Sequence, residues 1–208
     1  MERPPVKECC EIRTGIPERQ RAVLRAVLWI NAAMFLIELI ASLAAHSTAL
    51  LADAADMLGD AVVYGFSLYV VGRGERWQAR GALLKGAIMA VSGAGVLAEA
   101  VAKIILGVVP APDVMGAIGV VALGANAACL VLLRRHRDDD INMGSAWLCS
   151  RNDVVANGGV LVAAVGVLVT GAAWPDIAVG LAIALLFGSS AVKVIRGARR
   201  RLGELVPS

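Results

Sequence analysis

The chain has 208 residues, of which 58% are hydrophobic and only 18% are charged, with a formal net charge of +3 and a mean hydropathy of +0.72. In soluble domains about a quarter of the residues are charged. Here the charges fall in short clusters between apolar runs of roughly 20 residues, about the length of a membrane-crossing helix. The composition therefore excludes a soluble domain and indicates an integral membrane protein, in which basic clusters mark the cytoplasmic side rather than nucleic-acid binding.

The apolar runs predict an all-α fold, a bundle of six transmembrane helices. We expect these helices at about residues 23–45, 49–72, 82–107, 113–133, 144–170 and 175–195. They divide the chain into an N-terminal tail (1–20), a six-helix transmembrane domain (21–197) and a short basic tail (198–208), with no soluble domain after it. The first apolar run is too long for a cleaved signal peptide.

Basic residues occur in every second segment outside the helices. Lys or Arg is present in the N-terminal tail, in 73–81, after residue 133 and in the C-terminal tail, whereas 46–48, 110–113 and 171–176 contain neither. Short loops rich in Lys and Arg stay in the cytoplasm. The pattern predicts that both termini are cytoplasmic, and we expect a multi-pass protein of the bacterial inner (cytoplasmic) membrane.

The N-terminal tail contains Cys9 and Cys10 side by side. Two adjacent cysteines make an incomplete zinc site, so they are a weak candidate for capturing metal in the cytoplasm. Neither they nor the other two cysteines, Cys129 and Cys149, lie in a segment placed outside the cell. We therefore do not expect a disulfide framework.

Polar residues also occur on the first helix and at its end. Asn31 and Glu38 lie seven residues apart on one helix face, and Glu38 is either a proton-relay group or the partner in a hydrogen bond between helices. His46, next to the outer turn, either gathers metal at the mouth of the protein or is an incidental exposed histidine.

The second helix contains "LLADAADMLGDA", which places Asp53, Asp56 and Asp60 in an otherwise apolar run. Their spacing of i, i+3, i+7 keeps the three side chains within about 60° of one another around the helix. A charge near the bilayer centre costs roughly 2.5–3.5 kcal/mol on insertion scales. The acids must therefore face the interior of the bundle or a water-filled cavity.

Charged residues between the second and fifth helices carry less information. Glu99 and Lys103 are four residues apart on the third helix, and we expect them to neutralise each other. His136 and Asp138 lie in the run "RRHRDDD" after the fourth helix. That run is either a solvated loop or a loop that collects metal at the cytoplasmic entrance.

The fifth helix contains "CSRNDVVANGGVLVAA", in which Cys149, Asp153 and Asn157 follow an i, i+4, i+8 stripe on one face. At about 1.5 Å per residue, Asp56 and Asp60 lie about 12 and 18 Å from the outer end of the second helix. Asp153 lies about 15 Å from the inner end of the fifth, and a hydrocarbon core is about 30 Å thick. Two antiparallel helices can therefore bring Asp56, Asp60, Cys149 and Asp153 to one point near the midplane.

Carboxylates and a thiol that converge in a low-dielectric place resist ionising together, and a divalent cation removes that conflict. Four oxygen and sulfur ligands suit Zn²⁺ or Cd²⁺, whereas a site without the sulfur would favour harder ions. Because protons compete for the same ligands, such a site allows metal–proton exchange.

The alternative is that the acids are protonated, or paired with basic partners in structural hydrogen bonds. Cys149 can equally be a small buried apolar residue, and Asp53, one turn nearer the outside, is expected to support the site rather than bind the ion.

The six-helix layout, the two quoted motifs and "NAAMFLIEL" on the first helix resemble the cation diffusion facilitator family over roughly residues 20 to 197. The resemblance implies a homodimeric exporter of divalent transition metals with one tetrahedral mid-membrane site. The family pattern of His or Asp, three residues, then Asp falls on Asp56 and Asp60 and on Cys149 and Asp153, which would be the metal ligands. Glu38, Asn31, Asp53 and Asn157 would support them or carry protons.

Two features depart from the family pattern. Cys149 stands where relatives have His or Asp, so a ligating sulfur implies Zn²⁺ or Cd²⁺, and a non-ligating one allows Co²⁺, Fe²⁺ or Mn²⁺. The chain also stops about ten residues after the sixth helix, where typical relatives continue into a cytoplasmic domain, so it resembles a short form.

We expect a metal–proton antiporter working by alternating access, with no resident cofactor and no enzymatic activity. The alternative is a non-transporting membrane metal sensor or partner subunit.

Overall fold

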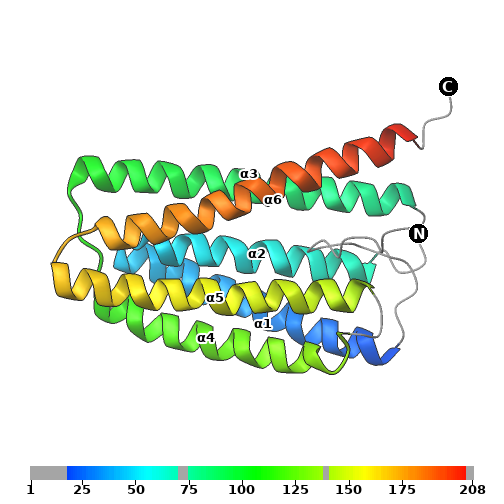
Figure 1. Cartoon of the computed structure of the whole chain (residues 1–208), viewed down its shortest axis with the longest axis horizontal. Coiled ribbons are helices and arrows are strands. Elements are labelled where there is room, and N and C mark those ends of the chain that lie inside the picture. Colours follow the sequence, from blue (N-terminus) through cyan, green and yellow to red (C-terminus); the bar gives the residue numbers. More distant parts are fainter. Residues whose placement is uncertain (1–17, 70–74, 138–140, 205–208) are drawn as a thin grey trace, which may run out of the picture.

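The computed structural model describes residues 18–69, 75–137 and 141–204 (Figure 1). Within these ranges the chain is all-α, as expected. The helices are α1 (Glu18–Ala45), α2 (Thr48–Tyr69), α3 (Glu75–Leu106), α4 (Pro112–Arg134), α5 (Ile141–Thr170) and α6 (Trp174–Glu204). They lie side by side in a long bundle, and α1 begins at the end of the bundle where α6 finishes.

Several helices are longer than the apolar runs predicted. α1 begins at Glu18 rather than near 23, α3 at Glu75 rather than near 82, and α6 continues to Glu204 rather than ending near 195. The additional turns are rich in Arg, Glu and Gln, which are good helix formers. Apolar composition indicates where a helix crosses the membrane, whereas the helix itself can continue into the water.

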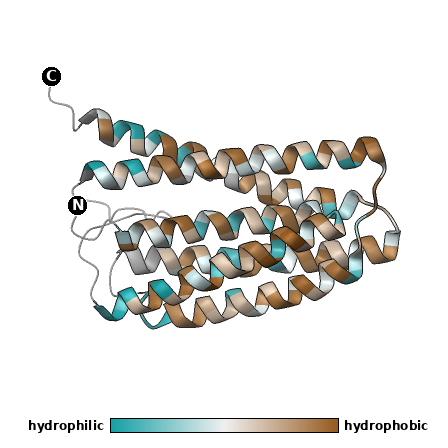
Figure 2. Cartoon of the chain, turned by 180° about the vertical axis from the view of Figure 1, so that it is seen from behind, coloured by the Kyte–Doolittle hydropathy of each residue, from teal (hydrophilic) through white to brown (hydrophobic). Residues whose placement is uncertain are grey.

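The surface of the bundle is apolar and much of its interior is polar, the reverse of a soluble protein. Val169 and Ile105 are 78% and 77% exposed, whereas Glu38, Asp53 and Asn157 are 0% exposed. Figure 2 shows that hydrophobic residues occur along the length of the helices. Five described helices are long and apolar enough to cross a membrane, and α2 alone falls outside this set because of its three aspartates. The protein is therefore a multi-pass integral membrane protein.

The helices pack as two groups, the pair α3 and α6 and the set α1, α2, α4 and α5. Within the second group α1 packs mainly against α2, and α4 packs mainly against α5 (Figure 1). α2 is central, since it also contacts α3, α5 and α6. The helix with the three aspartates therefore lies between the α3–α6 pair and the other helices.

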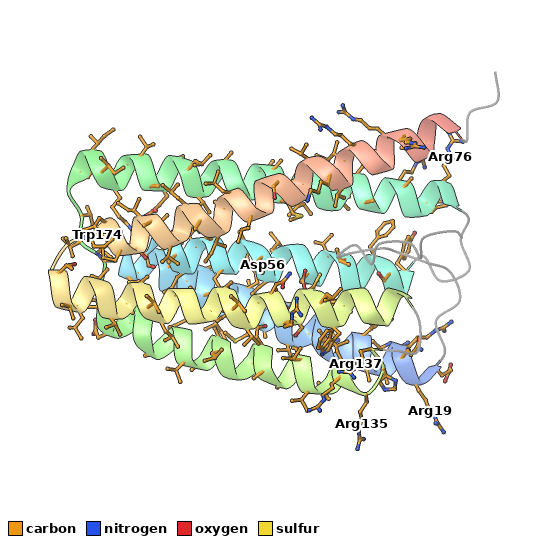
Figure 3. All side chains as sticks on the ribbon, in the orientation of Figure 1. Arg19, Asp56, Arg76, Arg135, Arg137 and Trp174 are labelled. Carbon is orange, nitrogen blue, oxygen red and sulfur yellow. The ribbon has the colours of Figure 1, made fainter. Side chains whose placement is uncertain are left out.

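The ends of the bundle differ in charge. The labelled Arg19, Arg76, Arg135 and Arg137 lie at one end, which we call the basic end, and Trp174 lies at the opposite end (Figure 3). Asp56 lies between the two ends. The prediction of cytoplasmic termini depends on this charge distribution. It places the basic end in the cytoplasm.

Close packing at the opposite end joins α6 to α2. A Cβ atom on Gly180 would lie 2.8 Å from the backbone carbon and oxygen of Thr48. Because backbone atoms cannot move aside as a flexible side chain can, only glycine permits this approach. Small residues allow transmembrane helices to pack closely, and this contact fixes the start of α2 against α6.

Candidate metal centre

The three aspartates of α2 differ in their surroundings. Asp53 and Asp60 are buried, at 0% and 3% exposed, whereas Asp56 is half-buried. Asp56 lines a small pocket between α2, α3 and α6, with Met89 and Ser92 on its far wall. The pocket has room for about one water molecule or ion. Asp56 is therefore the aspartate of α2 that lines this pocket.

Asp153 on α5 is buried, at 6% exposed, and faces the same region. Its carboxyl group interacts with those of Asp56 and Asp60, and more weakly with that of Asp53. The structure thus brings together three of the four predicted ligands. Among the described residues, however, no three Asp, Glu, His or Cys side chains converge tightly enough to hold a metal ion.

Cys149 is buried at 6% exposed on the same helix, one turn before Asp153. Its sulfur is in a disulfide bond, although we expected no disulfide. The ligand for zinc is the thiolate, and a disulfide sulfur has no such charge. In this form of the protein Cys149 is not available as a ligand, so its predicted role requires reduction.

Asp60 has partners that the sequence analysis did not single out. The Tyr64 hydroxyl donates a hydrogen bond to Asp60 Oδ2 at 2.9 Å. Cys129 on α4, which is free and buried, lies within electrostatic range of Asp60. The Asn31 amide donates to Cys129 Sγ at 3.9 Å and to the Val27 carbonyl at 2.9 Å. The i, i+4 spacing of Asp60 and Tyr64 was a usable signal, whereas no local pattern places α4 beside α2.

Glu38, Asp53 and Asn157 meet one turn away from Asp56, toward the opposite end. The Asn157 amide donates to Asp53 Oδ1 at 3.2 Å and to the Asp153 carbonyl at 2.9 Å. The Glu38 side chain reaches that of Asp53. These contacts join α1, α2 and α5, and the supporting or proton-carrying role of Glu38, Asp53 and Asn157 stays a prediction.

The predicted peripheral residues are separate from this region or cannot be placed. His46 is exposed in the turn between α1 and α2, with a left-handed φ of 52°. His136 is half-buried after α4, and its backbone N–H donates to the Leu133 carbonyl at 3.0 Å. Cys9, Cys10 and Asp138 lie outside the described residues. Where the chain is described, neither histidine is part of a metal-binding group.

A buried polar cluster, which we call the outer clasp, joins α2, α3 and α6 at the opposite end. Lys103 Nζ lies 2.7 Å from Asp176 Oδ2 and donates to Thr48 Oγ1 at 2.8 Å. Asp176 also accepts the backbone N–H groups of Thr48 and Ala49 at 2.8 and 3.1 Å, and so caps α2. The expected pair of Lys103 and Glu99 is present at 3.4 Å, but the closer partner is Asp176, 0% exposed on α6.

The helical bundle defines the class of protein as a multi-pass membrane protein, and its buried aspartates are unusual in such an apolar setting. A comparison with family models matches residues 24–202 to the cation efflux transmembrane domain. The chain therefore belongs to the cation efflux family, the cation diffusion facilitators, and is a cation efflux transporter. A comparison with curated proteins found no match.

Proposed function

We propose that the chain exports a divalent transition metal ion, with Zn²⁺ and Cd²⁺ as the leading substrates, in exchange for protons. The observation that carries the proposal is the approach of Asp56, Asp60 and Asp153, from two helices, inside the part of the chain that matches the cation efflux domain. Three carboxylates in a low-dielectric interior attract a divalent cation strongly, because its charge relieves their mutual repulsion.

Asp56, Asp60 and Asp153 would bind the ion, with Cys149 as the fourth ligand when it is reduced. The pocket beside Asp56 supports entry between α2 and the α3–α6 pair. A thiolate selects soft ions such as Cd²⁺ and Zn²⁺, whereas three carboxylates alone would also accept Co²⁺, Fe²⁺ or Mn²⁺. Selectivity therefore depends on the redox state of Cys149.

Transport would proceed by alternating access, with the α3–α6 pair moving against the remaining helices. The ion enters from the cytoplasm and leaves where protonation of the carboxylates displaces it. Coupling requires that metal favours one facing state and protons the other, since a ligand shifts an equilibrium only by its differential affinity. The membrane would be the bacterial inner membrane and the functional unit a homodimer.

The test is uptake of Zn²⁺ and Cd²⁺ into inside-out proteoliposomes with an acidic lumen. We expect uptake by the wild type that collapses when the pH gradient is removed, and no uptake by Asp60→Asn. Asp113→Asn is the matched control, because Asp113 is an exposed aspartate in the first turn of α4 and its loss should leave uptake unchanged.

The same experiment separates the alternative class of function. Binding of Zn²⁺ or Cd²⁺ without flux of these ions, or of Co²⁺, Fe²⁺ or Mn²⁺, would contradict the exporter and identify a membrane metal sensor or partner subunit. Uptake that does not depend on the pH gradient would support metal transport by the protein but would exclude exchange for protons.

A further inference from the structure

Glu38 is a buried carboxyl group without a hydrogen-bond donor. It is 0% exposed, and neither of its oxygens accepts a hydrogen bond from an N–H or O–H group of the described residues. A buried charge is costly unless it is paired. The group therefore needs either a positive charge or a proton to compensate it.

The nearest group to Glu38 is another buried carboxyl. The Glu38 side chain reaches Asp53, which is also 0% exposed, and Asp53 Oδ2 has no donor among the described side chains. Two carboxylates cannot donate to each other, so the pair needs at least one proton, and one shared proton gives a carboxyl–carboxylate hydrogen bond. The Asn157 amide donates to the remaining Asp53 oxygen, Oδ1, at 3.2 Å and so orients Asp53 toward α1.

No positive side chain faces this pair in the described part of the chain. The charged groups that act on Glu38 are Asp53 and Asp56. Those that act on Asp53 are Glu38, Asp56 and Asp153, and α5 adds the neutral Asn157. The pair is thus separate from Asp56, Asp60 and Asp153 but close enough for a charge bound there to act on it.

We propose that Glu38 and Asp53 form a proton-binding site distinct from the metal ligands, which holds one shared proton in the metal-free protein and releases it when a divalent cation binds at Asp56, Asp60 and Asp153. This rests on the proposed function. The O–H bond of the shared proton breaks, the proton passes to water, and the two carboxylates that remain are stabilised by the cation one turn away. When the cation leaves, the pair takes up a proton again.

The experiment counts protons released per Cd²⁺ bound, with the full chain purified in detergent and Cd²⁺ added to a weakly buffered solution with a pH indicator. We expect Glu38→Gln and Asp53→Asn each to bind Cd²⁺ and to release about one proton fewer per ion than the wild type. Asp113→Asn, which changes an exposed aspartate on α4, should release the wild-type number.

An unchanged proton count in both variants, with Cd²⁺ binding intact, would overturn this proposal and leave the proposed function standing. Absence of Cd²⁺ binding and proton release in the wild type would instead overturn the proposed function, and this inference with it. If neither variant folds, the infrared spectrum of the wild type decides. If saturating Cd²⁺ removes all infrared absorption of protonated carboxyl groups in the bilayer-buried region, the shared proton has been released and the proposal is supported. If such a band persists, the proton has stayed on the carboxyl groups and the proposal is contradicted.

Discussion

Cys149 can be part of a disulfide or a free thiolate, and the two forms would give different metal sites. As a disulfide it leaves three carboxylates, and as a thiolate it adds a soft ligand one helical turn from Asp153. The residue therefore connects the redox state of the protein to the ions that it accepts.

We predict that a reducing agent raises the affinity of the wild type for Cd²⁺ by about tenfold or more, because a strong sulfur ligand is gained. Titration calorimetry with and without the reductant measures this change. Cys149→Ala should bind Cd²⁺ with the oxidised wild-type affinity under both conditions. Cys129→Ala is the control, since Cys129 is a free buried thiol on α4 and its loss should leave the response to reductant in place. An identical affinity in reduced and oxidised wild type would contradict ligation by Cys149.

At the scale of the elements, the outer clasp and the Gly180 contact determine how α2 is placed. The clasp gives the first N–H groups of α2 a buried carboxylate, and the positive end of a helix dipole stabilises that negative charge. The start of α2 is therefore tied to α3 through Lys103 and to α6 through Asp176. Since α2 carries Asp56 and Asp60, these contacts also position the candidate metal centre.

We predict that Lys103→Met destabilises the folded protein by about 3–5 kcal/mol, because it leaves Asp176 as a buried charge without its counter-ion. Unfolding in lipid nanodiscs, followed by circular dichroism, measures the loss. The double variant Lys103→Met, Asp176→Leu should be no less stable than Lys103→Met alone. Glu99→Gln is the milder control, since the Glu99 side chain is 28% exposed. A stability of Lys103→Met equal to that of Glu99→Gln would contradict the clasp.

We predict that Gly180→Ala destabilises the bundle by about 1–3 kcal/mol, the usual cost of overpacking. The new Cβ would meet the Thr48 backbone at 2.8 Å, so α6 would have to move away from α2. The same unfolding measurement compares it with Gly188→Ala on α6, where a Cβ meets nothing within 4 Å. Equal stability of the two variants would show that α6 and α2 do not approach as described.

The sequence predicted the existence and order of the helices well, because each apolar run of α1, α3, α4, α5 and α6 is long enough to cross a membrane. At the basic end the helices were predicted too short, as at Glu18 and Glu204, since charged helix formers continue a helix into water. The contact between α2 and α5 was predictable from depth and face, and the joint role of Asp56, Asp60, Cys149 and Asp153 as ligands stays a prediction. The outer clasp was not, because Asp176 and Lys103 are 73 residues apart, and no helical period relates them.

For the whole molecule, the charge distribution predicts a topology in which the basic end faces the cytoplasm. The connection between α5 and α6 is at the opposite end, at the Trp174 side (Figure 3). We predict that a cysteine introduced at Ala172, in a chain whose own cysteines are replaced by serine, reacts with a membrane-impermeant maleimide added to intact cells. A cysteine at Arg135 should react only after the cells are opened. The reverse pattern would contradict cytoplasmic termini.

The pH dependence of metal binding also belongs to the whole molecule, because protons and the cation compete for one set of buried carboxylates. We predict that the affinity for Cd²⁺ falls as the pH is lowered, since metal binding needs deprotonated ligands and releases protons. Titration calorimetry over a range of pH measures the slope. An affinity that is independent of pH would exclude displacement of the ion by protons.

The central claim is that Asp56, Asp60 and Asp153 together bind the transported ion. The most direct measurement is the stoichiometry and affinity of Cd²⁺ binding to the purified wild type, Asp153→Asn and the control Asp113→Asn. Losing even an indirect support of a metal ligand costs about 10–100-fold in affinity, so we predict a loss of at least about 100-fold for Asp153→Asn and none for Asp113→Asn. Undiminished Cd²⁺ binding by Asp153→Asn would contradict the account.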